Sequence, residues 1–149
     1  MDSVKKHLEE QGLKVDGEGR VKVSASEFTL HDSGEALLIV GHEGARANLL
    51  LAPESDYTRE ADEIGVSDES KVGESNFDDH FVIRDPDSEA EEFLTEEVRS
   101  AVEKLLPFVE LEFNRRHYRL LIPASRQNEV KDVLQNLAEL IGKTRLADS

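Results

Sequence analysis

VELEFNRRHYRLLI, residues 109–122, carries the clearest structural signal in the chain. Apolar and charged residues alternate up to Phe113, the pair Asn114 and Arg115 interrupts the pattern, and an apolar run continues to Ile122. Strict alternation on both sides of a short polar turn predicts a β-hairpin with one apolar and one charged face. A two-residue turn gives the cross-strand pairs Val109–Leu120, Glu110–Arg119, Leu111–Tyr118 and Glu112–His117.

Helical patterns flank this hairpin on both sides. Before it, apolar residues repeat at helical spacing from Ala90 to Leu105, with Ser88 and Glu91 at capping-box spacing and a break near Thr95 that recaps the helix. After it, residues 125–141 repeat at the same spacing, and Gly142 is the expected stop. The second half therefore predicts a strand at 80–84, then helix, hairpin and helix.

The first half reads mostly as strands. A short amphipathic helix is expected over residues 3–11, followed by a hairpin in which 13–16 pairs with 21–24, and by a strand at 27–31. The runs 36–40 and 45–51 are predicted as a further hairpin of central strands, apolar on both faces. Together these patterns predict an α+β fold with an antiparallel or mixed sheet packed by helices, in the order α, several strands, α, β, β, α.

Composition limits the partners. The 149 residues suit a single domain spanning 1–149, and the formal net charge of -15 repels phosphate backbones and anionic lipids. We therefore expect neither nucleic acid nor membrane as a partner. The chain has no cysteine, no long apolar segment and no apolar leader, and a cytoplasmic location is expected. The same acidity also suits a salt-rich habitat.

Residues 53–76 lose all periodicity. They consist largely of Glu, Asp, Ser and Gly, and the composition predicts an acidic flexible loop or insert within the domain.

The segment FDDHF, residues 77–81, offers the strongest candidate for chemistry. Asp78, Asp79 and His80 are metal-ligand and acid/base residue types, and His31, His42 or His117 would have to complete such a site. However, only Asp78 and His80 share a face of a strand, and no recognised ligand spacing occurs in the chain. The preferred interpretation is structural: Phe77 and Phe81 anchor a strand while Asp78 caps main-chain amides. No catalytic, metal or cofactor residue is assigned, and no enzymatic activity is expected.

Residues 115–119, RRHYR, resemble a basic patch with an aromatic residue, as used against phosphates or bases. Because the predicted hairpin places glutamates opposite, a charge-balanced sheet face is the preferred interpretation.

The chain resembles two groups of proteins. Phe77-Asp78, then Phe81-Val82-Ile83, Asp85 and Phe93-Leu94-Thr95 resemble a pattern in uncharacterised bacterial proteins, a likeness that covers residues 73–144 and carries no known activity. In element order, size and acidity, the chain is also similar to the small chaperones of type III secretion systems. That resemblance implies a protein, usually dimeric, that holds an extended segment of a client. The strand at 80–84 and the acidic segment before it depart from that family.

The expected function is a non-enzymatic protein-binding module, chaperone-like or adaptor-like, that holds a basic or amphipathic segment of a partner at an apolar groove or sheet edge. A homodimer is left open, because two amphipathic helices need not both lie on one sheet face. The alternatives are a small metal-binding protein or metal-dependent hydrolase centred on Asp78, Asp79 and His80, and an acidic mimic of nucleic acid.

Overall fold

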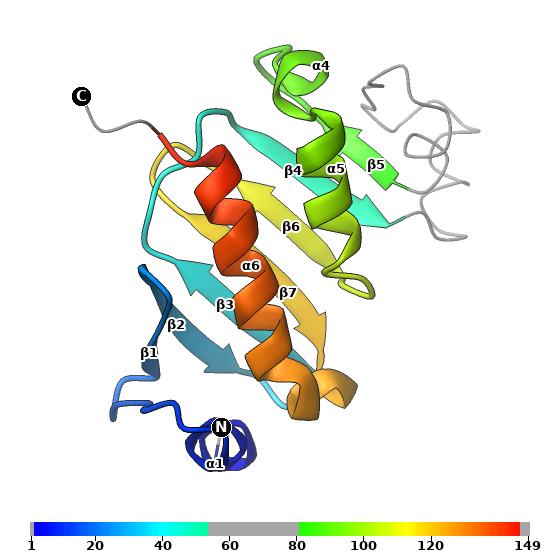
Figure 1. Ribbon diagram of the computed structural model, residues 1–149. Helices are drawn as coiled ribbons and strands as arrows, with labels where there is room; N and C mark the ends of the chain where they lie inside the picture. The colour runs from blue at the N-terminus through cyan, green and yellow to red at the C-terminus, as the bar shows by residue number, and fades with distance from the viewer. Residues whose placement is uncertain (1, 54–80, 147–149) are drawn as a thin grey trace.

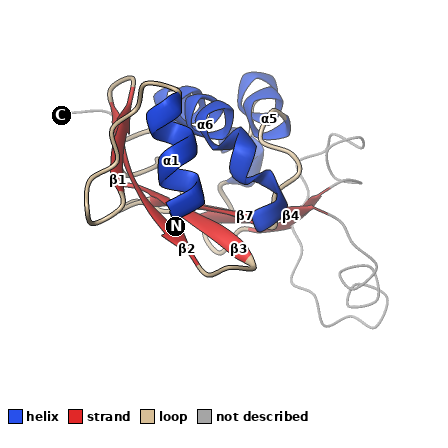
Figure 2. Ribbon diagram, turned by 90° about the horizontal axis from the view of Figure 1, so that it is seen from below, coloured by secondary structure: helices blue, strands red, loops and turns tan. Residues whose placement is uncertain are grey.

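The fold is a single antiparallel sheet with helices on one side (Figures 1 and 2). The computed structural model describes residues 2–53 and 81–146. The segment 54–80, which includes most of the predicted acidic loop, lies outside the described residues. In chain order the elements are α1 (Asp2–Glu10), β1 (Arg20–Val23), β2 (Ser26–Asp32), β3 (Ala36–Gly41), β4 (Leu49–Pro53), β5 (Phe81–Arg84), α4 (Ala90–Phe93), α5 (Glu96–Glu103), β6 (Glu110–Phe113), β7 (Tyr118–Pro123), a 3₁₀ helix η1 (Ala124–Glu129) and α6 (Val130–Thr144).

The seven strands are ordered β1-β2-β3-β7-β6-β4-β5, and each neighbouring pair is antiparallel. The β6–β7 hairpin therefore lies between β3 and β4, which are consecutive in the sequence. The predicted α+β class is confirmed, and the sheet is purely antiparallel rather than mixed.

One row of side chains crosses the inner face of the sheet. The pairing registers of six consecutive strands align the residues Leu30, Ile39, Leu120, Leu111, Leu51 and Ile83. All six are buried. Cross-strand neighbours on one face lie within contact distance, so the row forms a continuous apolar band.

Three helices cover this face (Figure 2). The apolar stripe of α6, from Val130 to Ile141, is buried, and α6 contacts both α1 and α5. Because α1, α5 and α6 all lie on the same side, the second apolar helix predicted from the sequence covers the inner face rather than the other side.

The prediction that residues 36–40 and 45–51 form a hairpin is wrong. β3 pairs with β7, and β4 pairs with β5 and β6. Residues 42–48 instead cross the end of the β6–β7 hairpin: Ala45 N donates to Asn114 O at 2.8 Å and Arg46 N to Thr144 O at 2.9 Å. The sequence pattern predicts a strand here, but the main-chain N–H groups find their hydrogen-bond partners in distant segments instead.

The register of the β6–β7 hairpin also differs from the predicted one. Leu111 lies opposite Leu120 and Glu112 opposite Arg119, so the loop contains four residues, 114–117, rather than two. Asn114 Oδ1 accepts from Arg116 N at 2.9 Å within this loop. The slip moves each partner by two residues, which keeps the apolar and charged faces as predicted. Val109 is the exception, with 46% of its surface exposed.

The helix ends follow the predictions in part. Thr95 caps α5 as expected, since its side chain accepts from Val98 N at 3.3 Å. The preceding short helix is capped by Asp85 rather than Ser88, because the Asp85 carboxylate accepts from Glu89 N and Ala90 N at 2.8 and 2.7 Å.

Gly142 does not stop the last helix, which continues to Thr144. Thr144 is buried and donates to Leu140 O at 2.8 Å. Since its single hydroxyl hydrogen is used there, Tyr118 Oη donates to Thr144 Oγ1, at 2.7 Å. This buried bond ties the end of α6 to β7.

A buried arginine fixes the loop between α5 and β6. Arg126 of η1 is only 8% exposed, and its Nη1 donates to Leu105 O at 2.7 Å and to Pro107 O at 2.8 Å. Its Nη2 donates to Glu129 Oε1 at 3.3 Å. Two main-chain carbonyls in the loop that follows α5 are thereby satisfied by one side chain.

Gly44→Ala is expected to destabilise the fold by about 1–3 kcal/mol, as overpacking does. A Cβ at this position would overlap Arg115 O, a main-chain atom that cannot rotate away. Gly142→Ala is the matched control, because no atom lies within 4 Å of its added Cβ. Denaturant unfolding should leave that variant unchanged, or more stable by up to about 1 kcal/mol through helix propensity. Equal stability of the two variants would contradict the crossing described for residues 42–48.

Tyr118→Phe is expected to cost about 1 kcal/mol near neutral pH, because one buried hydrogen bond is lost. Burial raises the pKa of Tyr118 from 10.0 to about 12. The unfolded chain therefore releases this proton before the folded chain does, and the resulting stability is complete below about pH 10 and lost as the pH rises to about 12. In unfolding free energies measured across this range, the wild type should lose its stability advantage over the variant, because only the wild type carries this phenol. A constant difference between them would argue against a buried, protonated phenol.

Candidate binding surfaces

None of the helices in the described part of the chain covers the outer face of the sheet (Figure 2). The strand registers place one row of residues across it, from one edge strand to the other: Arg20, Thr29, Val40, Arg119, Glu112, Leu50 and Arg84. A second row contains His31, Leu38, Leu121 and Glu110. We call these two rows the open face.

Apolar and charged residues are mixed on the open face. Leu38, Val40, Leu50 and Leu121 are half-buried, whereas Arg119 and Glu110 are exposed. A shallow pocket of about 90 Å³ lies near the middle, lined by Leu38, Leu121, Glu110, Glu112 and Arg119. This surface thus combines a small apolar floor with carboxylates and a guanidinium at its rim.

Glu112 on the open face has basic residues as neighbours. His117 Nε2 lies 3.1 Å from Glu112 Oε1, and Arg119 is the cross-strand partner of the same glutamate. The predicted pairing of Glu112 with His117 therefore exists as a side-chain contact, although the two residues are not opposite in the ladder. Opposite charges on neighbouring strands stabilise the sheet modestly and fix its outer surface.

The basic run 115–119 does not form an exposed aromatic patch. Tyr118 is buried on the inner face, and Arg115 makes an ion pair with Glu89 at 2.9 Å. The predicted interpretation of this run as part of a charge-balanced sheet is consistent with these contacts.

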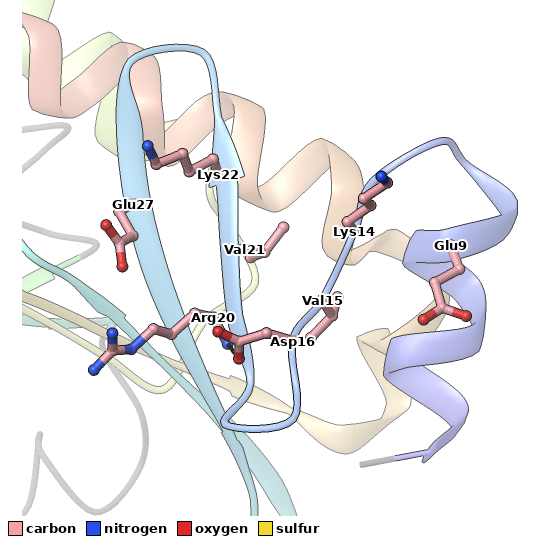
Figure 3. Close-up of a pocket in the computed structure, with 8 residues that line it drawn as sticks. All are labelled: Glu9, Lys14, Val15, Asp16, Arg20, Val21, Lys22 and Glu27. Atoms are coloured by element: carbon pink, nitrogen blue, oxygen red, sulfur yellow. Dashed lines mark hydrogen bonds between the residues drawn. The ribbon is translucent and has the colours of Figure 1, made fainter.

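A second surface lies at the edge of the sheet beside β1. A groove of about 650 Å³ separates β1 from the chain segment that follows α1 (Figure 3). Its lining residues are Glu9, Lys14, Val15, Asp16, Arg20, Val21, Lys22 and Glu27. Val15 and Val21 are buried and lie on facing walls, and the other lining residues are charged. We call this surface the edge groove.

The edge groove exists because the predicted hairpin of 13–16 with 21–24 closes only at its turn. Asp16 N donates to Arg20 O at 3.1 Å, and Asp16 Oδ1 accepts from Glu18 N at 2.8 Å and from Arg20 N at 2.9 Å. The bonds from the main chain of Arg20 and then Glu18 hold the pKa of the Asp16 carboxyl below its usual value. Beyond this turn Leu13 N donates to Leu8 O at 2.9 Å, which ties the segment to α1 instead of β1.

The residues proposed for a metal site are not brought together by the described part of the chain. Asp78, Asp79 and His80 lie outside the described residues. His42 contacts Thr29 Oγ1 through Nε2, His31 is exposed on the open face, and His117 contacts Glu112. Within residues 2–53 and 81–146, no group of three or more His, Asp or Glu side chains is arranged to hold a metal ion.

Phe81 follows the preferred structural interpretation of the FDDHF segment. It is 1% exposed, belongs to the core and stacks on Phe108, with 6.0 Å between ring centroids. Its neighbour Phe77 lies outside the described residues.

The sequence predicted binding at an apolar groove or sheet edge, but it did not locate either surface. The apolar run 36–40 was expected to be buried on both faces, whereas its burial alternates and Leu38 and Val40 reach the open face. The signal for the open face was the charged alternation of residues 110–119, which requires one solvent-facing side. None of the described helices has the length and apolar character needed to cross a membrane.

Comparison with known proteins identifies a related fold but no family. No protein-family model matches the chain, and no curated protein matches its sequence. The fold is similar to that in the crystal structure of the mycobacterial trehalose monomycolate transport factor A, TtfA, with a TM-score of 0.60 and 10% sequence identity. The match covers 99% of this chain and 97% of that one. At this identity the likeness shows the fold alone.

Adjacent leucines on β3 test which face is open. Leu37→Ala should destabilise the protein by about 2–5 kcal/mol, because Leu37 is 1% exposed in the core. Leu38→Ala should cost about 1 kcal/mol, since Leu38 is half-buried on the other face. Denaturant unfolding of both variants measures the difference, and comparable losses would show that the outer face is covered.

Proposed function

We propose that this chain is a non-catalytic protein-binding module, adaptor-like or chaperone-like, which holds an amphipathic segment of a partner protein on the open face. The observation that carries the proposal is the one-sided cover of the sheet: three helices lie on the inner face, and none of the described helices lies on the outer one. Sheets of this kind bury the uncovered apolar residues when a partner adds a second layer.

The composition of the open face fits a protein interface. Leu38, Val40, Leu50 and Leu121 supply an apolar centre, and charged residues surround it. Protein interfaces commonly have an apolar core and a polar rim, and buried apolar area provides most of the affinity. The charged rim fixes the register of the partner, because a misplaced charge would be left unpaired.

The charge of the whole chain favours a basic partner segment. A net charge of -15 attracts cationic segments at long range and repels other acidic proteins. On the open face, Glu110 and Glu112 are the carboxylates nearest the apolar centre. An amphipathic partner with apolar residues over the leucines and a basic residue near Glu110 satisfies both conditions.

Two resemblances support an accessory role. The similar crystal structure is that of a protein named a transport factor, and a similar fold is consistent with an accessory role. Independently, the similarity in element order, size and acidity to type III secretion chaperones implies a protein that holds a client segment.

The proposal is tested by capture from extracts of the native host. The double variant Leu38→Glu/Leu121→Glu places two charges on the apolar centre and should lose the captured partner. Its matched control is Asn128→Glu/Gln135→Glu, which adds the same charge at exposed positions in η1 and α6 and should retain it. Unfolding measurements on both variants separate loss of binding from loss of the fold.

Light scattering on the same proteins tests whether the partner is a second copy of this chain. A dimer mass that the Leu38→Glu/Leu121→Glu variant alone abolishes would make this face a homodimer interface and overturn a foreign client. Capture of the same proteins by both double variants, or of none by the wild type, would refute the proposed binding face.

A further inference from the structure

Among the residues that the structure describes, the main chain of β1 has one unpaired position at the edge of the sheet. In the antiparallel ladder with β2, Leu30 N donates to Gly19 O at 2.9 Å, and the alternation places Val21 opposite Phe28 and Val23 opposite Ser26 as the next hydrogen-bonded pairs. The N–H and C=O groups of Arg20 and Lys22 therefore point away from β2, toward the edge groove.

These two outward positions differ. Asp16 binds both main-chain groups of Arg20. Asp16 N donates to Arg20 O at 3.1 Å, and Asp16 Oδ1 accepts from Arg20 N at 2.9 Å. Lys22 has no such partner among the residues that the structure describes. Asp16 thus closes the groove at the turn and leaves it open at Lys22.

The opposite wall is unpaired as well. Lys14 and Val15 follow the end of α1, and within the described ranges no hydrogen bond involves their main chain. Figure 3 shows this segment running beside β1, with Val15 and Val21 on facing walls. The walls of the groove therefore carry both apolar side chains and main-chain groups without a partner among the described residues, which are the features that an added β-strand uses.

The charges in the groove identify the occupant. Three lining residues are acidic, Glu9, Asp16 and Glu27, and three are basic, Lys14, Arg20 and Lys22. Asp16 caps the turn, Arg20 lies 3.5 Å from Glu18, and Lys22 faces Glu27 across the ladder. In contrast to the chain as a whole, the groove has no net charge, so it favours a segment without net charge.

We propose that the edge groove receives a short, extended, uncharged segment of a partner protein, which adds as a further strand to β1. A residue of that segment exchanges two main-chain hydrogen bonds with Lys22, and a β-branched side chain packs over Val15 and Val21. The inference rests on the proposed protein-binding function, but it uses a separate surface from the open face. Because the main-chain groups of Arg20 are already bonded to Asp16, the hydrogen bonds with Lys22 set the register of the added strand on β1.

The probe is the capped peptide acetyl-Thr-Val-Thr-Val-Thr-amide, titrated into isotope-labelled protein. We expect amide shift changes confined to residues 13–16 and 20–23, and slower hydrogen exchange at the Lys22 amide. The same peptide with N-methyl groups on both valines keeps its apolar surface but loses strand donors, and should bind about tenfold more weakly. This comparison needs no change in the protein.

Two variants test Lys22 directly. Lys22→Pro removes the outward N–H without removing a donor to β2, and proline is tolerated at such edge positions. It should weaken binding of the peptide about tenfold, whereas Lys22→Ala, which keeps the N–H, should bind like the wild type. Thermal unfolding of both variants verifies the fold.

The inference is overturned if the peptide leaves the groove amides unchanged at about 5 mM, or if the methylated and unmethylated peptides bind equally. Equal binding would indicate a site for apolar small molecules. The variant Leu38→Glu/Leu121→Glu should still bind the peptide. If this variant still captures the host protein while the wild type binds the peptide, only the open face is rejected. If the variant loses capture but the wild type does not bind the peptide, only the groove is rejected.

Discussion

The structure depends on the apolar row that crosses six strands on the inner face, from Leu30 to Ile83. Each aliphatic side chain in it contributes about 1.5–3 kcal/mol when fully buried, and the row is continuous only in the observed strand order. Helix α6 lies over the middle strands of the sheet (Figure 1), and the bond between Tyr118 and Thr144 fixes its end to β7. Because the described helices all lie on one side, they leave the outer face of the sheet uncovered.

Local patterns in the sequence predicted the elements well, and their partners poorly. The alternation of residues 109–122, the helix break at Thr95 and the apolar stripe of the last helix all correspond to observed elements. The partner of β3 was predicted wrongly. Ala45 and Ala47 are buried as strand residues would be, but they lie in the loop that crosses the end of the β6–β7 hairpin. The main-chain partners of Ala45 and Arg46 come from residues about 70 to 100 positions later, which no local pattern reveals.

The candidate surfaces were less predictable than the fold. The FDDHF segment has the ionisable residue types of a metal site, but its described member, Phe81, serves the core. The open face follows from burial of only every second residue in β3, whereas an apolar run suggests a strand buried on both sides. The edge groove depends on Leu13, whose amide continues the hydrogen bonding of α1 and draws the chain away from β1. Judged from residue types alone, segments 13–16 and 21–24 could pair along their whole length as a hairpin.

The insertion of the β6–β7 hairpin between β3 and β4 has a consequence for biosynthesis. As the polypeptide leaves the ribosome, residues 36–41 emerge long before residues 118–123, their partners in the finished sheet. Until then β3 and β4 each have an edge that lacks its permanent neighbour, and both carry apolar side chains. The nascent amino-terminal half is therefore the aggregation-prone stage of this protein's life, and translation of the carboxy-terminal third ends it.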